Sequence, residues 1–141
     1  MAKPKHEDTA ERLASLGHRL TAQRIVILEA LSRSRQTVTA QELYEQLKPE
    51  HPYLGRATVF RNLDALVEVG LAQRFERAGH VYAYASCSQE HHHHLICVHC
   101  HRATEVSEVT VAPLVAELQA AEGFVVEHSA LDFYGTCRDC R

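Results

Sequence analysis

Four cysteines in the second half of the sequence occur in two pairs with the same spacing. Two residues separate Cys97 from Cys100, and two separate Cys137 from Cys140. Two such pairs supply four thiolates, the ligand set of a closed tetrahedral zinc site. A metal bound there would close the loop of 36 residues between Cys100 and Cys137 and so stabilise it. The alternatives, two redox-active dithiols or four unrelated cysteines, leave the matched spacing unexplained.

A run of four histidines precedes the first cysteine pair. Alternate residues of an extended segment face the same side, so His92 and His94 share one face and His91 and His93 share the other. One of these histidine pairs, together with other ligands, would make a second metal site, and Cys87 and Glu105 are the candidates to complete it. A set of Cys and His ligands favours Zn²⁺ over Mn²⁺ or Fe²⁺. The alternative is a solvated polar run.

The residues before this run predict short helices followed by a β-hairpin. Helices are expected at residues 6–16, after Thr21, from Thr39 to Pro49 and at residues 56–69. Strands at residues 71–75 and 80–85 flank the turn residues Ala78 and Gly79. This order is typical of a winged helix-turn-helix, in which one helix enters the DNA major groove.

The helix expected at residues 56–69 carries polar groups suited to DNA. Residues 1–83 have a net charge of only about +2, so the placement of their charges matters more than the total. The candidate contacts to phosphates or base edges are Arg56, Thr58, Arg61 and Asn62 on this helix, and Arg19 and Arg24 around the start of the second helix. The alternative is that these are ordinary solvated helix residues.

The later part of the chain predicts a small mixed domain. Strands are expected at residues 95–98 and 104–106, a helix at 109–121, and extended segments at 124–126 and 130–134. The exposed edges of so small a sheet favour pairing with a second copy, so we expect a homodimer. The predicted fold is therefore α+β, with a winged-helix DNA-binding domain at residues 1–85 and a small α/β metal-binding dimerisation domain at 86–141.

Composition and missing motifs exclude other classes of protein. The 141 residues carry a net charge of −3, and 45% are hydrophobic, which is ordinary for a globular chain. No apolar run approaches the roughly 20 residues that span a bilayer, and no secretory signal begins the sequence, so we expect a cytoplasmic protein without a membrane partner. A zinc enzyme is disfavoured because the sequence contains neither an H-E-x-x-H motif nor an H-x-E motif followed by C-x-x-C. A zinc storage protein would not need a winged helix.

Three segments of the sequence resemble the ferric uptake regulator family. The resemblance is carried by residues 55–63 (GRATVFRNL), 91–100 (HHHHLICVHC) and 134–140 (YGTCRDC). It implies a metal-dependent repressor that binds palindromic operator DNA as a homodimer and is not an enzyme, with no small-molecule substrate. It also implies structural zinc on the four paired cysteines and a regulatory metal on His92 and His94. Phe60 stands where the family usually has Tyr, and it joins the expected DNA-contacting residues.

The choice of metal depends on the hairpin and on Cys87. Residues 82–85 contain no carboxylate, whereas Cys87 lies ten residues before Cys97, and this looks like the zinc uptake regulator subgroup. That resemblance implies a fourth regulatory ligand from the hairpin region, for which Glu76 or His80 are the candidates. We therefore expect zinc-dependent repression of metal-uptake genes. The alternatives are an iron-, manganese- or peroxide-sensing regulator of the same family, with Mn²⁺ or Fe²⁺ at the regulatory site.

His91 and His93, on the other face of the histidine run, suggest a third metal site. In the family such a site uses this face, an acidic residue and a later histidine. We expect His91, His93, Glu105 and His128 as its ligands, and Glu108 could also contribute.

Overall fold

The computed structural model describes residues 6–87 and 91–141, with the side chains of residues 6–9 left out. The chain separates into two compact units, Met1–Gln89 and Glu90–Arg141. We call them unit 1 and unit 2. The division lies four residues beyond the expected boundary at 85/86. Cys87 remains with the hairpin of unit 1 because its backbone N–H donates to the carbonyl of Leu71 at 3.0 Å.

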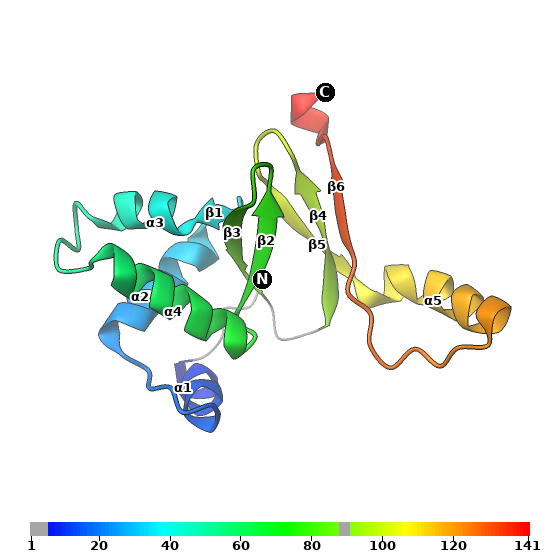
Figure 1. The fold of residues 1–141 in the computed structure, drawn as a ribbon, viewed down its shortest axis with the longest axis horizontal. Coiled ribbons are helices and arrows are strands. Elements are labelled where there is room, and N and C mark those ends of the chain that lie inside the picture. The colour runs from blue at the N-terminus through cyan, green and yellow to red at the C-terminus, as the bar shows by residue number, and fades with distance from the viewer. Residues whose placement is uncertain (1–5, 88–90) are drawn as a thin grey trace. The chain divides into compact units, whose positions relative to one another are not determined.

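Unit 1 has the helices and hairpin of a winged helix-turn-helix (Figure 1). Its elements are α1 (His6–Ser15), α2 (Ala22–Arg33), β1 (Val38–Thr39), α3 (Ala40–Leu47), α4 (Arg56–Glu68), β2 (Ala72–Arg77) and β3 (Val81–Ser86). The three strands form an antiparallel sheet in the order β1-β3-β2. The four expected helices and the hairpin are confirmed, whereas the short strand β1 was not expected.

Apolar residues at helical spacing hold these helices together. Ile27 of α2, Leu43 of α3 and Leu63 of α4 are fully buried in one core. Burial of each such side chain contributes about 1.5–3 kcal/mol. The Thr39 side chain accepts from the Glu42 backbone, and the Glu42 side chain accepts from the Thr39 backbone, so α3 begins with the expected capping box. The shared core fixes α4, the expected recognition helix, against α2 and α3.

An ion pair attaches the hairpin to the start of α3. The Arg77 guanidinium donates to Glu42 Oε1 at 2.9 Å and to the carbonyl of Thr37 at 2.5 Å. The Arg77 side chain is only 17% exposed, and a charge-assisted bond of this kind is strong where water is largely excluded. The hairpin is thus held to the same helices as α4.

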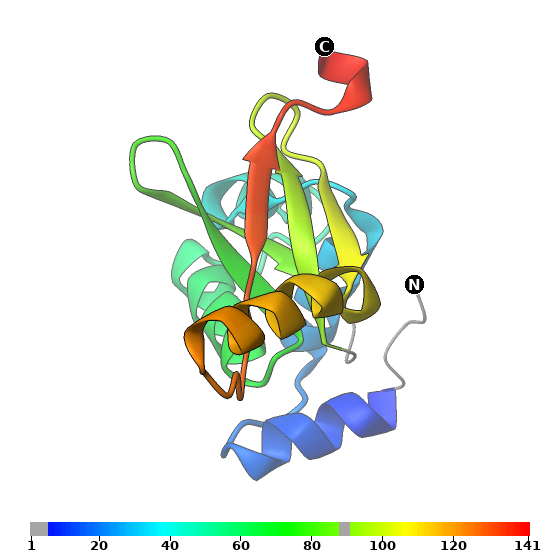
Figure 2. The ribbon, with the colours of Figure 1, turned by 90° about the vertical axis from the view of Figure 1, so that its right-hand side faces the viewer.

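Unit 2 is a small sheet with one helix and a C-terminal turn (Figures 1 and 2). Its elements are β4 (His92–Cys97), β5 (Ala103–Ser107), α5 (Glu108–Glu122), β6 (Asp132–Gly135) and the 3-10 turn η1 (Arg138–Cys140). The sheet order is β5-β4-β6, antiparallel between β4 and β5 and parallel between β4 and β6. The expected extended segment at 124–126 forms no strand, because this stretch connects α5 to β6.

Unit 2 buries little apolar surface by itself. Its large hydrophobic side chains that are exposed are Leu95, Val98, Val109, Leu114, Leu118, Phe124, Val125, Phe133 and Tyr134. An exposed apolar surface of this extent is typical of a subunit interface. Among the described residues, no helix is both long and apolar enough to cross a membrane.

Candidate functional site

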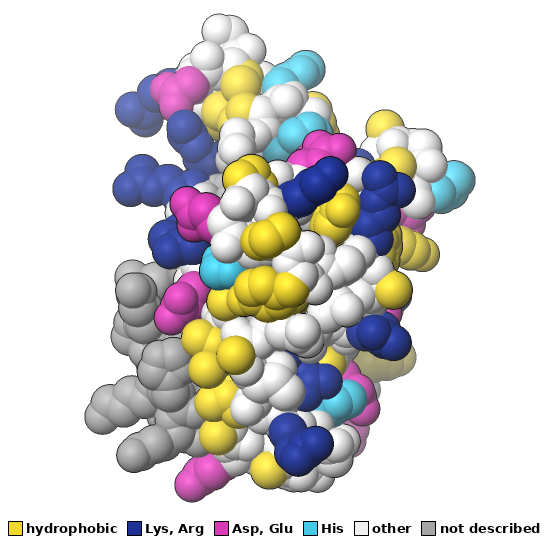
Figure 3. All heavy atoms as spheres, turned by 90° about the vertical axis from the view of Figure 1, so that its left-hand side faces the viewer, with side chains coloured by type: hydrophobic (Ala, Val, Ile, Leu, Met, Phe, Trp, Pro, Cys, Tyr) yellow, Lys and Arg dark blue, Asp and Glu magenta, His cyan; other side chains and the backbone are white. Residues whose placement is uncertain are grey.

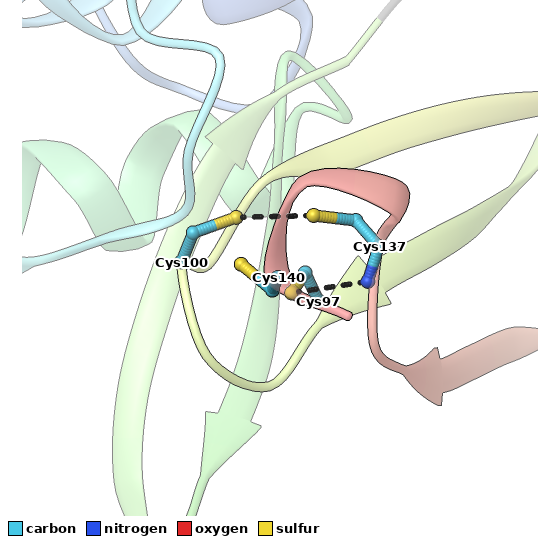
Figure 4. Close-up of side chains that lie close together, drawn as sticks. All are labelled: Cys97, Cys100, Cys137 and Cys140. Carbon is cyan, nitrogen blue, oxygen red and sulfur yellow. Dashed lines mark hydrogen bonds between the residues drawn. The ribbon is translucent and has the colours of Figure 1, made fainter.

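The four paired cysteines converge in unit 2 (Figure 4). Their sulfur atoms all lie within 4.8 Å of one another, and Cys100 Sγ is 3.7 Å from Cys137 Sγ. Two sulfurs of a disulfide are only about 2.05 Å apart, whereas two thiolates on a tetrahedral zinc, with Zn–S bonds of about 2.3 Å, lie about 3.8 Å apart. The arrangement therefore fits a zinc ion and does not fit disulfides.

The parallel pairing of β4 and β6 explains this convergence. Cys97 lies opposite Gly135 in the register, and the Val98 backbone N–H donates to the Gly135 carbonyl at 2.9 Å. Cys137, the first cysteine of the second pair, follows Gly135 by two residues. This strand register therefore places the second pair beside Cys97 at the end of β4. The spacing in the sequence predicted that the two C-x-x-C pairs share a metal site. The pairs come together because the chain returns through α5 and β6 to the side of β4.

Backbone N–H groups favour a thiolate at one of these cysteines. The N–H groups of Cys100 and Cys137 lower the pKa of Cys97 to about 5, and the Cys137 N–H lies 3.4 Å from Cys97 Sγ. Hydrogen bonding to the Cys137 side chain, with burial, instead raises the pKa of Cys140 to about 12. Because a metal binds thiolates and not thiols, these N–H groups favour the form of Cys97 that can bind a metal.

His92 and His94 face each other on one side of β4. Their Nε2 atoms are 3.1 Å apart, and Glu105 Oε1 lies 3.5 Å from His92 Nε2. Glu105 is directly opposite His94 in the antiparallel register of β4 and β5, and opposite residues point to the same face. The structure therefore places Glu105 with His92 and His94.

A carboxylate orients the ring of His94. Asp132 Oδ1 lies 3.3 Å from His94 Nδ1. An ionised carboxylate only accepts hydrogen bonds, so the neutral ring carries its proton on Nδ1 and directs the lone pair of Nε2 toward His92. Burial, and secondly the nearby His92, lower the pKa of His94 below its ordinary value of 6.5, while Asp132 partly opposes this. The buried His94 is thus held in the neutral tautomer that binds metal through Nε2.

On the opposite face His91 and His93 converge on Glu108. Glu108 Oε2 lies 2.5 Å from His93 Nε2 and 3.1 Å from His91 Nε2, and the rings of His91 and His128 are 5.5 Å apart. The expected ligand Glu105 is wrong for this face because β5 turns it to the other side. Glu108 takes its place because it is the first residue of α5, where the strand alternation ends.

His93 is held in the tautomer that does not suit a metal. Its side chain is fully buried, and its Nδ1 accepts a hydrogen bond from the Leu131 backbone N–H at 3.0 Å. The proton of the neutral ring is therefore on Nε2, where it is donated to Glu108. A metal at Nε2 would have to displace this proton and break the bond to Leu131. The ligand atoms of His91, His93 and Glu108 nevertheless all lie within 4.8 Å of one another, close enough to share a metal ion. A third metal site here therefore stays a prediction, and it would require His93 to change its tautomer.

The hairpin residues proposed as a fourth regulatory ligand do not lie near Cys87. Cys87 follows β3 at the base of the hairpin, where its Sγ is 3.9 Å from Gln73 Oε1. Glu76 pairs with Tyr82 near the tip, and Glu76 hydrogen-bonds to His80 in the turn. The five residues from Tyr82 to Cys87 correspond to about 16 Å along a strand. Glu76 and His80 therefore cannot share one ion with Cys87.

The expected DNA-contacting residues of α4 divide between two faces. Arg56, Phe60 and Arg61 are exposed and Thr58 is half-buried. Asn62 is only 6% exposed and donates its side-chain amide to the Thr58 carbonyl at 2.7 Å. Asn62 lies three residues after the buried Val59, so helical spacing turns it toward the core. The structure therefore does not place Asn62 with the exposed residues of α4 that could contact DNA.

Two arginines expected to meet phosphates precede or begin α2. Arg19 is exposed, whereas Arg24 is half-buried and its guanidinium donates to the Arg19 carbonyl. Arg24 therefore holds the turn before α2. Figure 3 shows the face of the molecule on the side of these helices, with Lys and Arg side chains spread among hydrophobic ones.

Comparisons with known proteins agree with this architecture. The profile described as the ferric uptake regulator family matches residues 15–134. A zinc uptake regulation protein of Mycobacterium tuberculosis is 33% identical over 129 residues, which cover 92% of this chain and 99% of that protein. A peroxide-responsive repressor of Staphylococcus saprophyticus is 30% identical over 135 residues, covering 96% and 90%. The crystal structure of the Vibrio cholerae ferric uptake regulator has a TM-score of 0.70 and 30% identity, covering 92% of this chain and all of that one. These proteins are named for different signals, so similarity alone does not indicate the metal.

Proposed function

Because this chain belongs to the ferric uptake regulator family, we propose that it is a zinc-responsive repressor of metal-uptake genes. Members of the family are metal-responsive transcriptional regulators, so the chain is a DNA-binding, metal-binding regulator and not an enzyme. The proposal adds the metal, the sensing residues and the regulated genes. It also places the protein in the cytoplasm as a homodimer on palindromic operator DNA.

The contrast between His94 and His93 carries the proposal. Asp132 leaves Nε2 of His94 unprotonated and facing His92, whereas the Leu131 N–H leaves Nε2 of His93 protonated. Metal ligation requires a neutral imidazole with a free lone pair on the binding nitrogen. His92 Nε2 lies 3.1 Å from His94 Nε2, so His92 donates to the lone pair of His94 the proton that a metal would replace. We therefore assign the sensing site to the face of His92, His94 and Glu105, and a structural zinc to the four paired cysteines.

Cys87 is the proposed fourth ligand of the sensing site. It precedes His92 by five residues, and a chain of five residues spans at most about 17 Å, so the two residues stay near each other in the chain and a suitable backbone conformation would bring the thiol to this face. One sulfur, two nitrogens and one carboxylate oxygen form a four-coordinate set that zinc accepts readily. Zinc bound to these residues would act as a cross-link between them.

This ligand set suggests how metal controls DNA binding. Cys87 belongs to unit 1, which contains the DNA-reading α4, and the two histidines with Glu105 belong to unit 2. Holding Cys87 to these residues restricts the spacing of the two α4 helices in a dimer, as a palindromic site requires. The coupling is reciprocal, so operator DNA must raise metal affinity as much as metal raises DNA affinity, typically by about 1–3 kcal/mol.

The test compares DNA binding at matched free concentrations of Zn²⁺, Mn²⁺ and Fe²⁺. The probe is a DNA duplex selected from a random pool by the zinc-loaded protein. We expect zinc-selective binding by the wild type, and a Cys87→Ser variant that stays folded and dimeric but is no longer activated by zinc. The adjacent Ser86→Ala substitution is the matched control. Undiminished zinc activation of Cys87→Ser would remove Cys87 from the site.

Iron or manganese sensing is the second candidate, favoured by the carboxylates beside the histidines. Without Cys87, the ligand set would consist of His92, His94 and Glu105, with Asp132 behind His94. Sets of nitrogen and oxygen ligands suit Fe²⁺ and Mn²⁺ better than sets containing sulfur do. Activation selective for Mn²⁺ or Fe²⁺ would favour this function, and an iron site of this kind could also respond to peroxide.

A further inference from the structure

One aromatic ring on α3 lies beneath two positive charges. The Arg56 guanidinium carbon lies 5.4 Å from the ring centroid of Tyr44, and the Lys48 Nζ atom lies 5.9 Å from it. Both distances are within the range of cation–π attraction. The Tyr44 ring packs against the core of unit 1, whereas Arg56 is exposed. The ring therefore provides a fixed platform for a side chain that would otherwise be mobile.

The stability of α4 does not explain the position of Arg56. Arg56 is the first residue of this helix, and a positive charge at a helix N-terminus is opposed by the helix dipole. The first turn of α4 contains no acidic residue, and its N-cap, Gly55, makes no side-chain capping bond. The positive charge of Arg56 is unfavourable for α4, and yet the Tyr44 ring holds it in place. This combination indicates that Arg56 has a role in binding a ligand.

We propose that Tyr44 is a positioning residue that orients Arg56 to read a guanine in the DNA major groove. The inference rests on the DNA binding in the proposed function. The first residues of a recognition helix face base edges, and Arg pairs with the O6 and N7 atoms of guanine through two parallel N–H bonds. This pairing requires a set orientation of the planar guanidinium. A guanidinium held over a ring keeps N–H donors available for a base.

The experiment measures base preference at every position of the selected duplex for the full-length zinc-loaded protein. We expect Arg56→Ala to lower the preference for one G·C pair in each half-site by about 5- to 150-fold, with little change elsewhere. Tyr44→Leu lowers the same preference, whereas Tyr44→Phe, which keeps the ring, retains it. Arg56→Lys keeps the charge at an exposed position but loses the preference, so the test does not depend on the folding of the Tyr44 variants.

Salt dependence separates base reading from phosphate binding. Arg56→Lys and Tyr44→Leu should leave the slope of affinity against salt concentration unchanged, because no charge is lost. A uniform loss of affinity over all sequences in Arg56→Ala, with no change in base preference, would show a phosphate contact and overturn the proposal. An unchanged preference in Tyr44→Leu would overturn the positioning role. DNA binding by the wild type that is independent of metal would contradict the proposed sensing function and leave guanine reading intact, so the two failures are distinguishable.

Discussion

Asp132→Asn tests the assignment of the sensing site without removing a proposed ligand. The introduced amide can still accept a hydrogen bond from His94 Nδ1, but it lacks the negative charge that fixes the tautomer and raises the basicity of the ring. The substitution should therefore weaken zinc binding at His92 and His94 and leave the four-cysteine site unaffected. Asp132 is 31% exposed, so the neutral amide can be accommodated without a buried charge being left unpaired.

The distance in the structure sets the expected size of the effect. Loss of an outer-shell partner of a ligating histidine typically reduces metal affinity 10- to 100-fold, or about 1.4–2.8 kcal/mol. Asp132 Oδ1 lies 3.3 Å from His94 Nδ1, which is longer than the 2.7–2.9 Å of a strong charge-assisted bond. We therefore expect the lower end of the range, about tenfold, for Asp132→Asn.

Zinc competition with a chromophoric chelator measures this change, after the structural site has been filled. Glu108→Gln is the matched comparison, because it removes the carboxylate from the opposite histidine face. We expect Glu108→Gln to leave the sensing affinity within about twofold of the wild type, since His93 keeps its bond to Leu131. Normal zinc affinity in Asp132→Asn together with a large loss in Glu108→Gln would refute the tautomer argument and move the sensing site to His91 and His93.

Further predictions concern stability, pH and the recognition helix. Cys97→Ser should lower the melting temperature of unit 2 and release its zinc to a chelator, and an unaltered melting curve would contradict a structural zinc there. Because the pKa of His94 is lowered by burial, protons compete with metal only in acid. Zinc affinity of the sensing site should therefore rise with pH, with its imidazole-dependent step below pH 6.5, and an affinity that stays flat as the pH falls through the acid range below 6.5 would argue against histidine ligation. Asn62→Asp should reduce the free energy of unfolding of unit 1 by about 1–3 kcal/mol in denaturant titrations, because it buries a carboxylate against the Thr58 carbonyl. Reduced DNA binding by this variant at full stability would restore Asn62 to the interface.

The sequence by itself determined the features that depend on near neighbours in the chain. The capping box of Thr39 and Glu42 involves residues three apart, and it marks the start of α3 as expected. The equal spacing of the cysteine pairs singled out the four residues that converge in unit 2. The alternation of side chains along a strand divided the histidine run into its two faces, because that geometry repeats every two residues in any strand.

Only the tertiary structure decided which distant groups meet these residues. Glu105 and Glu108 are only three residues apart in the chain. The register of β5 places Glu105 beside His92, whereas Glu108, at the start of α5, lies beside His93. Polarity suggested Asn62 for DNA, but the packing of α4 turned it into the core. The tautomers of His93 and His94 depend on Leu131 and Asp132, almost 40 residues away in the chain. No local pattern encodes such contacts, because they arise when β6 returns beside β4, and they determine which histidine can bind a metal.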